Sequence, residues 1–373
     1  MHILFAGGGT AGHINPALAV AGYIKSVEPE TKISYIGTAN KLEAKLVPAA
    51  GYDFYTIDVA GFQRKLTIKN IFKNIVAVEK MFSSSRRARK LLKELKPDVV
   101  VGTGGYVSGP VLREAVKLGI KTAIHEQNAY PGITTKALAP NVDRVMLAMP
   151  EAEKLLNLKN KPIITGNPVR AELTKITKVK ARKKLGFDKD IPLILSFGGS
   201  LGARPINEAI VGVIKDHNNT GKCYHIHGAG KAGFESTVEA LRNSCGKLAE
   251  EISVREYIDN MDVCMAAADL VICRAGAITL SELTVCSKPS ILIPSPYVAE
   301  NHQFHNAMTL KNCGAAEVIE EKDLTAELLS ATVSELLNDS DKLATMSENA
   351  HNAAIIDSNE RIYKVIAELY TKN

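Results

Sequence analysis

Thirteen short apolar runs alternate with longer amphipathic segments along this chain of 373 residues, and no other feature restricts its fold as strongly. Strands that alternate with helices form βαβ units, in which the strands are parallel and the helices cover the faces of the sheet. Runs such as Val99-Val100-Val101 and Leu193-Ile194-Leu195 lack polar alternation, which is typical of strands buried on both faces. The sequence therefore predicts an α/β protein with doubly wound parallel sheets.

The expected strands form two series. The first comprises residues 2–6, 33–37, 53–57, 98–102, 122–126, 144–148 and 163–165, and the second comprises residues 192–197, 224–228, 254–258, 269–273, 289–293 and 315–319. Between them, Gly166-Asn167-Pro168 ends a strand, and residues 175–184 are polar and rich in lysine. We therefore expect two Rossmann-like domains, 1–168 and 169–351, that face each other across a cleft. Ligands of such sheets bind at the carboxyl ends of the strands.

Charge differs between the two halves. Residues 1–170 have a net charge of +11 and residues 191–373 a net charge of −9, within a total of +6. A basic half favours nucleic acid, anionic lipid or a phosphorylated ligand as its partner. The chain opens on an apolar run without a basic leader, and no stretch of about 18 uncharged apolar residues is present, so we expect neither a secretory signal nor a membrane span. The six cysteines form no C-x-x-C pair and are expected to be reduced thiols of a cytosolic protein.

A glycine-rich turn follows the first expected strand. Gly7, Gly9 and Gly12 match G-x-G-x-x-G, but a dinucleotide fold would place an acidic residue at the end of the second strand, where this chain has residues 36–40 without one. This absence argues against NAD and leaves a loop whose backbone N–H groups suit an anion. The alternative is a tight turn without a ligand.

A second glycine-rich loop, residues 102–110, follows another apolar strand of the same half. Its glycines, among them Gly104 and Gly105, are costly unless the backbone approaches a ligand or adopts a positive φ. Two such loops in one domain would suit a diphosphate, whereas the alternative is a strained turn.

His13 follows the first loop and is expected in the first turn of a helix, where a neutral imidazole could take a proton from a substrate hydroxyl or bind a phosphate. His125-Glu126-Gln127-Asn128 ends another strand and either points into the cleft or caps a turn.

The second half repeats the pattern. Gly198-Gly199-Ser200-Leu201-Gly202 follows its first strand, and Arg274 to Glu282 follows the strand at 269–273. Small residues after a strand provide N–H donors at a helix start, and Glu282 could reach a ribose diol or simply stabilise the helix dipole. Glu300-Asn301-His302-Gln303 offers side chains that recognise hydroxyl groups.

A metal site is not expected. Asp188-x-Asp190 and Asp339-x-Asp341 have the D-x-D spacing of metal-dependent sugar-nucleotide transferases, but both lie in polar connections away from the glycine loops. Without a metal, backbone donors and cations must stabilise a leaving diphosphate, and Arg170 is the best-placed cation.

Taken in order along nearly the whole chain, these motifs resemble those of the MurG family, the peptidoglycan N-acetylglucosaminyltransferases. The residues that carry the resemblance are Gly8-Gly9-Thr10-Ala11-Gly12-His13, Gly104-Gly105-Tyr106-Val107-Ser108-Gly109-Pro110, His125-Glu126-Gln127-Asn128, Gly166-Asn167-Pro168-Val169-Arg170, Gly198-Gly199-Ser200, Arg274-x-Gly276-Ala277-x-Thr279-x-x-Glu282 and Gln303. The resemblance implies a B-type glycosyltransferase fold. It also implies inverting transfer of N-acetylglucosamine from UDP-N-acetylglucosamine to the 4-hydroxyl of N-acetylmuramic acid in undecaprenyl-pyrophosphoryl-MurNAc-pentapeptide (lipid I to lipid II), without a cofactor. Such an enzyme works in cell-wall biogenesis, at the cytoplasmic face of the bacterial cell membrane.

The resemblance also implies roles for individual residues. Donor binding would fall to the second domain and acceptor binding to the first, where the position of His13 makes it our candidate for the catalytic base. The donor site would comprise Thr10, Ala11, Gly12, Asn128, Arg170, Ser200, Ile258, Ala277, Ile278, Thr279, Leu280, Ser281, Glu282 and Gln303, with Ile258 at the uracil, Glu282 at the ribose, Ser200 and Arg170 at the diphosphate, and Gln303 and Asn128 at the sugar. The acceptor's diphosphate would lie at Gly9, Gly104, Gly105, Tyr106 and Ser108. A last helix, about 352–373, would pack back on the first domain.

Two positions depart from the family's motifs. Ala11 stands where the family usually has glycine, and His302 replaces the first residue of a Gln-Gln pair, which puts one sugar contact in doubt. Two other interpretations remain open: a related glycolipid synthase with a diacylglycerol acceptor, and a non-catalytic nucleotide-binding or NAD-dependent protein.

Residues 64–96 contain eleven Lys or Arg against two acidic residues. Ile68, Ile71, Phe72, Ile75 and Phe82 recur at helical spacing, so the segment is either an ordinary surface helix packed on the sheet or a membrane dock. As a dock, Phe72 and Ile75 would enter the bilayer surface while Lys69, Lys73 and Arg86 meet anionic phospholipid headgroups. We expect no nucleic-acid partner.

Overall fold

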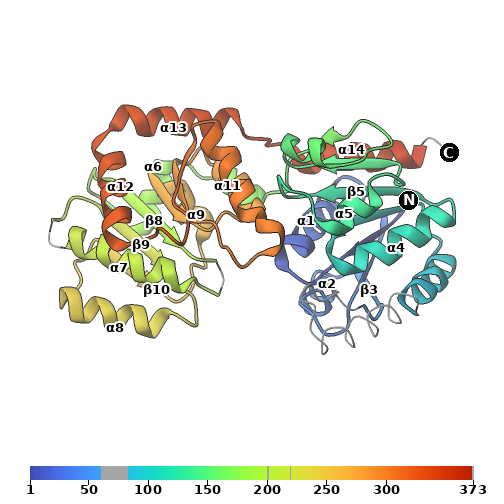
Figure 1. The fold of residues 1–373 in the computed structure, drawn as a ribbon, viewed down its shortest axis with the longest axis horizontal. Coiled ribbons are helices and arrows are strands. Elements are labelled where there is room, and N and C mark those ends of the chain that lie inside the picture. The colour runs from blue at the N-terminus through green and yellow to red at the C-terminus, as the bar shows by residue number, and fades with distance from the viewer. Residues whose placement is uncertain (60–82, 200, 219, 372–373) are drawn as a thin grey trace. The chain divides into compact units, whose positions relative to one another are not determined.

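The computed structural model describes residues 1–59, 83–199, 201–218 and 220–371, and the chain forms two compact units. Unit 1 comprises Met1–Val169 together with Asp357–Asn373, and unit 2 comprises Arg170–Ile356. Each contains its own parallel sheet with helices on both faces (Figure 1). Among the described residues, no helix combines the length and the apolar character that a bilayer span needs.

Unit 1 has a seven-stranded parallel sheet in the order β3-β2-β1-β4-β5-β6-β7. Its strands are β1 (His2–Gly7), β2 (Lys32–Gly37), β3 (Asp53–Thr56), β4 (Val99–Gly104), β5 (Lys121–Glu126), β6 (Arg144–Leu147) and β7 (Ile163–Ile164). The order reverses direction beside β1, so the loops after β1 and β4 leave the sheet toward opposite faces. Ligands of doubly wound sheets bind at such a switch point.

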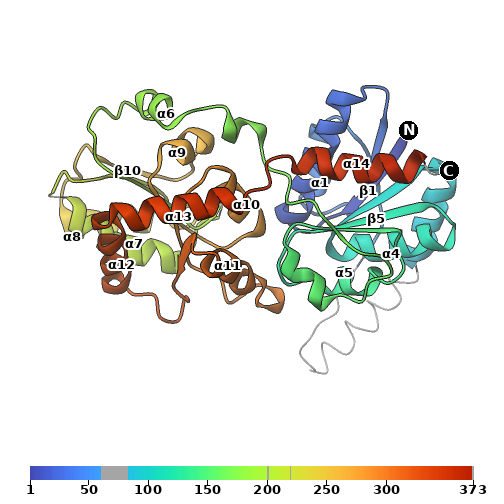
Figure 2. The same ribbon diagram turned by 90° about the horizontal axis from the view of Figure 1, so that it is seen from above.

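Helices cover both faces of this sheet, as the wholly apolar strands predict. Ile3 and Phe5 pack with α1 (Ala11–Val27) and α14 (Ser358–Thr371), whereas Leu4 and Ala6 pack with α4 (Gly105–Lys117), α5 (Ile133–Leu138) and the helix at 83–95. The remaining helical segments are α2 (Glu43–Ala49) and the 3₁₀ helix η1 (Pro150–Leu155). Figure 2 shows α14 alongside α1, on the face that both helices cover.

Unit 2 has a six-stranded parallel sheet in the order β10-β9-β8-β11-β12-β13, which repeats the reversal seen in unit 1. Its strands are β8 (Leu193–Phe197), β9 (Tyr224–Gly228), β10 (Ile252–Arg255), β11 (Leu270–Cys273), β12 (Ser290–Leu292) and β13 (Ala316–Val318). Its helices are α6 (Lys178–Leu185), α7 (Arg204–Asn218), α8 (Phe234–Cys245), α9 (Met261–Ala267), α10 (Ala277–Val285), α11 (His302–Asn312), α12 (Ala326–Asn338) and α13 (Ser340–Asn352), with 3₁₀ helices η2 (Ala171–Thr174) and η3 (Ala299–Asn301).

Every apolar run expected to be a strand overlaps a strand of the structure. The end of β10 and the start of the last helix differ from expectation by several residues. β10 ends at Arg255, because the chain then leaves the sheet and Ile258 packs its side chain over Gly228 instead of continuing the ladder. The last helix begins at Ser358 and not near 352, since α13 runs to Asn352 and a short connection follows. The lysine-rich segment before β8 contains α6, which Lys178 and Arg182 anchor to Asp269.

Candidate functional site

In unit 1, the turn after β1 places small, exposed residues at the start of α1. Gly9 has φ +92°, a conformation that favours glycine, and Thr10, Ala11 and Gly12 are exposed. α1 has no side-chain cap at its N-terminus, whereas the threonines and aspartate that begin α6, α12 and α13 accept hydrogen bonds from their helices. The N–H groups of Ala11 and Gly12, the first two residues of α1, have no intrahelical partners, which suits an anionic ligand.

Glu43, which the sequence motifs did not single out, hydrogen-bonds to the turn after β1. Its Oε2 accepts a hydrogen bond from the backbone N–H of Gly9 (3.1 Å), and its Oε1 accepts from Thr38 N (3.0 Å) and Thr38 Oγ1 (2.7 Å). A Cβ at Gly8 would lie 2.3 Å from Glu43 Oε1, so the carboxylate needs a glycine there. Burial acts to raise the pKa of Glu43, but the hydrogen bonds from Thr38 and Gly9 outweigh it and the pKa lies below its ordinary value.

The second glycine loop packs against the first. Gly104 and Gly105 have φ of +105° and +80°, the positive values that we expected for glycines in this loop. A Cβ at Gly105 would lie 2.3 Å from Gly8 O. Tyr106 is 61 % exposed, whereas Ser108 is buried: its hydroxyl donates to Ala6 O (2.7 Å) or Gly104 O (2.9 Å) and accepts from Gly104 N (3.1 Å). Ser108 therefore holds the loop together, and its hydroxyl is not available to a diphosphate.

His13 lies between the two loops, with its ring against Gly104. Its Nδ1 lies 3.1 Å from Gly8 O and 3.3 Å from Thr10 Oγ1. A carbonyl oxygen only accepts hydrogen bonds, so Nδ1 carries the proton of the neutral ring and Nε2 keeps a free lone pair. Nε2 has no hydrogen-bond partner among the described residues, and it is therefore the atom that can take a proton from a ligand.

The polar residues that end β5 are mostly used inside unit 1. Glu126 is 3 % exposed: its Oε1 accepts from Asn128 N (3.1 Å) and Asn128 Nδ2 (3.0 Å), and its Oε2 accepts from Gly132 N (3.0 Å) and Thr135 Oγ1 (2.5 Å). His125 Nε2 donates to Gly166 O (2.9 Å), and burial, the largest influence, lowers the pKa of His125. These contacts support the second of the two roles that the sequence left open for His125 and Glu126, namely holding the turn after β5 together. Asn128 remains partly exposed.

In unit 2, α10 begins directly after β11 and its N-cap, Gly276, provides no side-chain cap. Glu282 Oε1 accepts a hydrogen bond from Arg170 Nε (3.1 Å) and forms an ion pair with Arg170 Nη2 (3.1 Å), while Oε2 has no partner among the described residues. The Glu282 side chain is 13 % exposed, and burial raises the pKa of its carboxyl even though Arg170 opposes the shift. A carboxylate with one oxygen fixed and the other open suits a ligand that donates hydrogen bonds.

Other predicted donor residues surround the same edge of unit 2. Ile258 is buried, and neither its N–H nor its C=O has a hydrogen-bond partner in the described part of the chain. Gln303 Oε1 accepts from Ser295 N (2.9 Å), and Glu300 and Asn301 just before it have positive φ values of 53° and 50°. Along α10, Ala277 and Leu280 are buried, whereas Ile278, Thr279 and Ser281 are partly exposed.

Several predicted positions lie outside the described residues or away from the site. Ser200, Lys69, Phe72, Lys73 and Ile75 are outside the described residues, while Arg86 is exposed on the helix at 83–95. The first aspartate of each D-x-D pair has a structural contact: Asp188 accepts a hydrogen bond from Tyr224 OH, and Asp339 caps the N-terminus of α13. Within the ranges that the structure describes, no cluster of three or more His, Cys, Asp or Glu is arranged to hold a metal ion.

Comparison with known proteins identifies the family. Residues 3–147 match the glycosyltransferase family 28 N-terminal domain, and residues 193–362 match the glycosyltransferase family 28 C-terminal domain. The chain is 47 % identical over 370 residues to an enzyme of Acetivibrio thermocellus, covering 99 % of this chain and 98 % of the relative, and 46 % identical over 369 residues to one of Ruminiclostridium cellulolyticum, covering 99 % and 100 %. Both are named UDP-N-acetylglucosamine–N-acetylmuramyl-(pentapeptide) pyrophosphoryl-undecaprenol N-acetylglucosamine transferase.

A solved structure agrees with these matches. The crystal structure of Acinetobacter baumannii MurG aligns with a TM-score of 0.80 at 29 % identity, over 98 % of this chain and 99 % of that one. The two parallel-sheet units thus form a B-type glycosyltransferase fold, and the resemblance found in the motifs is confirmed. The chain belongs to glycosyltransferase family 28, within the family of UDP-N-acetylglucosamine–N-acetylmuramyl-(pentapeptide) pyrophosphoryl-undecaprenol N-acetylglucosamine transferases.

Proposed function

We propose that this protein transfers N-acetylglucosamine from UDP-N-acetylglucosamine to the 4-hydroxyl of N-acetylmuramic acid in undecaprenyl-pyrophosphoryl-MurNAc-pentapeptide. The observation that carries this proposal is the identity of 46–47 % with enzymes named for that transfer, over nearly the full length of both chains. The open carboxylate oxygen of Glu282 and the open Nε2 of His13 supply the two groups that such a transfer needs, one in each unit.

The donor binds unit 2 in this proposal. Glu282 Oε2 accepts hydrogen bonds from the ribose hydroxyls, and the backbone of Ile258 pairs with the uracil. The start of α10, at Ala277 to Ser281, faces the diphosphate together with Arg170 and Ser200. Gln303, Asn128 and the Thr10–Gly12 turn contribute to the sugar end of the donor. Arg170 already forms an ion pair with Glu282 Oε1. One guanidinium therefore orients the Glu282 carboxylate that binds the ribose and supplies positive charge to the diphosphate.

The acceptor's diphosphate binds the paired glycine loops of unit 1, at Gly9, Gly104, Gly105 and Tyr106. The N–H groups of Gly9 and Gly104 already donate to Glu43 and Ser108, so the amides that follow them at the starts of α1 and α4 are the ones offered to the ligand. The acceptor's 4-hydroxyl attacks C1 of the donor sugar, His13 Nε2 takes its proton, and the C1–O bond to UDP breaks. A single displacement of this kind inverts the anomeric centre.

Transfer of labelled N-acetylglucosamine to a short-chain lipid I analogue, with and without EDTA, tests the proposal directly. We expect the labelled disaccharide product in both conditions, because backbone donors and Arg170 take the place of a metal in stabilising UDP. Labelled product with a diacylglycerol acceptor but not with the lipid I analogue would overturn the proposal. Product that disappears only with EDTA would overturn its metal-free part.

For location, we propose peripheral binding at the cytoplasmic face of the cell membrane. Support comes from the basic segment 64–96, and from a lipid-linked acceptor in the names of the relatives. Each cation near an anionic surface contributes about 1 kcal/mol, so reversing the charge at Lys69, Lys73 and Arg86 should abolish binding to anionic vesicles. Activity on a short-chain soluble acceptor should persist. A reversed variant that still sediments with anionic liposomes at physiological salt would show that another surface is the dock.

A further inference from the structure

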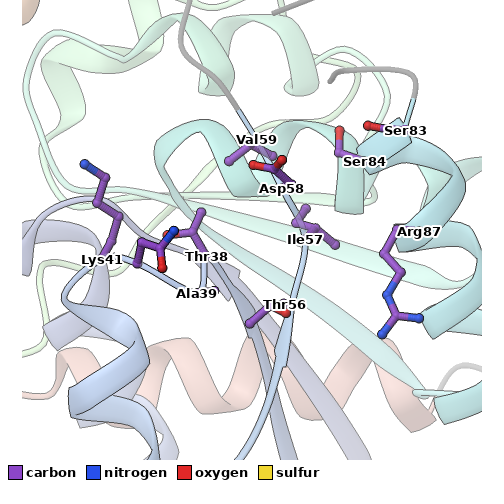
Figure 3. Close-up of a pocket in the computed structure, with 11 residues that line it drawn as sticks. Thr38, Ala39, Lys41, Thr56, Ile57, Asp58, Val59, Ser83, Ser84 and Arg87 are labelled. Atoms are coloured by element: carbon purple, nitrogen blue, oxygen red, sulfur yellow. The ribbon is translucent and has the colours of Figure 1, made fainter. Parts of the chain in front are cut away.

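Unit 1 has a hollow at the carboxyl ends of β2 and β3 that the motifs did not indicate (Figure 3). Its volume is about 560 Å³, within the range of sites that hold small ligands. The lining residues come from the segments that follow these two strands and from the helix at 83–95: Thr38, Ala39, Asn40, Lys41, Thr56, Ile57, Asp58, Val59, Ser83, Ser84 and Arg87.

Charges of both signs line this hollow. Lys41 and Arg87 are exposed, and neither forms an ion pair or a side-chain hydrogen bond within the described part of the chain. They flank the hollow on opposite sides, with Asp58 between them (Figure 3). Two cations on opposite sides of the hollow suit a ligand that carries separate carboxylate groups.

Glu43 connects this hollow to the first glycine loop. The N–H of Thr38, a lining residue, donates to one oxygen of the Glu43 carboxylate (3.0 Å), and the N–H of Gly9 donates to the other (3.1 Å). Glu43 thus contacts both the first glycine loop and a residue that lines the hollow. The hollow is therefore a neighbour of the loop at which we place the acceptor's diphosphate.

We propose that this hollow is the subsite for the peptide carried by the acceptor's muramyl sugar, with Lys41 and Arg87 binding peptide carboxylates. The inference rests on the proposed function and adds to it a recognition site for one part of the acceptor. Relatives are named for an N-acetylmuramyl-(pentapeptide) acceptor, and five residues span up to about 16–18 Å when extended. A branch of that reach can extend from the glycine loops toward the hollow, where the hydroxyl of Thr56 suits a peptide amide.

Two acceptors and matched variants test this inference. Transfer kinetics are measured with a short-chain pentapeptide acceptor and with the same acceptor lacking its peptide, for K41Q, R87Q and the double variant. K45Q and K90Q are the controls: each removes an exposed cation from the same stretch of chain, outside the hollow. All four positions are exposed, so folding should not change, which thermal unfolding checks.

We expect the double variant to raise KM for the pentapeptide acceptor about tenfold or more, as expected for lost charge-assisted contacts. KM for UDP-N-acetylglucosamine and the kinetics with the peptide-free acceptor should stay unchanged, and the controls should match the unchanged protein. An equal rise for both acceptors, or no rise for either, would overturn the inference. Absence of transfer by the unchanged protein to the pentapeptide acceptor would instead overturn the proposed function itself.

Discussion

The buried carboxylates near the strand ends of the two units differ in how their oxygens are used. In unit 1, Glu43 and Glu126 each accept hydrogen bonds on both oxygens from backbone and side-chain donors of the same unit. In unit 2, Glu282 uses Oε1 alone, for Arg170, and Oε2 has no partner in the described part of the chain.

This difference in hydrogen bonding indicates that a glutamate can either hold a loop in shape or bind a ligand. Hydrogen bonds on both oxygens commit Glu43 and Glu126 to holding the shape of the loops in unit 1. Burial raises the pKa of Glu282 because it disfavours the charged carboxylate, and Arg170 offsets this only in part. A ligand that donates hydrogen bonds to Oε2 would stabilise the charged form further. In unit 1, Nε2 of His13 has no hydrogen-bond partner among the described residues, which is why we propose this atom as the general base.

Replacing His13 should have the largest effect. Loss of a general base lowers turnover by about 10²–10⁴-fold, so His13→Ala should reduce kcat to that extent while the Kd for UDP is unchanged. His13→Asn is the matched control, because its amide can still donate to Gly8 O but has no atom at the Nε2 position. If Asn restores turnover, His13 only holds the loop, and a base must be sought elsewhere, for example at His302.

Glu126→Gln should destabilise unit 1. The carboxamide offers one acceptor oxygen and places an NH₂ against N–H or hydroxyl donors, and stranded buried donors cost about 2–4 kcal/mol together. The midpoint of thermal unfolding should fall accordingly, with UDP affinity retained, since Glu126 lies outside unit 2. Glu151→Gln, at an exposed carboxylate of the same unit, should change nothing. Unaltered unfolding of the Glu126 variant would mean that its carboxylate is not committed to the loop and is again available as a base.

Glu282→Ala should show the opposite pattern, with affinity lost and stability kept. Removing a charge-assisted hydrogen bond to ribose costs about 1.5–3 kcal/mol, which raises the Kd for UDP about tenfold or more. The thermal midpoint should shift less than for Glu126→Gln, because no hydrogen-bond donor other than Arg170 loses its partner, and Arg170 is half exposed. Calorimetric titration measures the Kd, with Glu335→Ala, at an exposed side chain of α12, as control. An unchanged Kd would remove Glu282 from the donor site.

The sequence predicted the features that depend on local chemistry. All thirteen strands were apparent because each is an apolar run between polar or glycine-rich segments, and the positive φ of Gly104 and Gly105 follows from the cost of paired glycines after a strand. The end of β10 was misjudged, because Tyr257 and Ile258 continue an apolar pattern although the chain there has already left the sheet.

Contacts between distant segments were not predictable in the same way. Glu43 reaches Gly9 across 34 residues, and nothing in its spacing marks it as different from any acidic residue at the start of a helix. The hollow likewise depends on β2, β3 and the helix at 83–95 meeting at one edge of unit 1. The one available hint was that a polar residue, Thr38, directly follows β2, because polar residues also occur at the end of β5.

The pH dependence of stability should distinguish the units further. In unit 2, Ser196 Oγ lies 2.8 Å from both His225 Nε2 and His227 Nδ1, and both rings are fully buried. Burial lowers the pKa of His227 to about 4 and that of His225 well below its ordinary value. In unit 1, His125 is the comparable buried imidazole, with its Nε2 on a carbonyl.

Acid should therefore weaken unit 2 more than unit 1, with the smallest effect among these predictions. In the unfolded chain a histidine takes up its proton near pH 6.5, whereas folded His227 stays neutral down to about pH 4. Between these values the unfolded state binds more protons, so stability falls as the pH drops, by about 2 kcal/mol for His227 from pH 7 to pH 5. His227→Asn retains a polar atom near Nδ1 but cannot titrate, so it should be less stable at pH 7 yet lose less on acidification. Thermal unfolding of both proteins at pH 7, 6 and 5, followed with and without UDP to identify the transition of unit 2, measures the difference. Parallel losses in the two proteins would show that His227 does not set the acid sensitivity of unit 2.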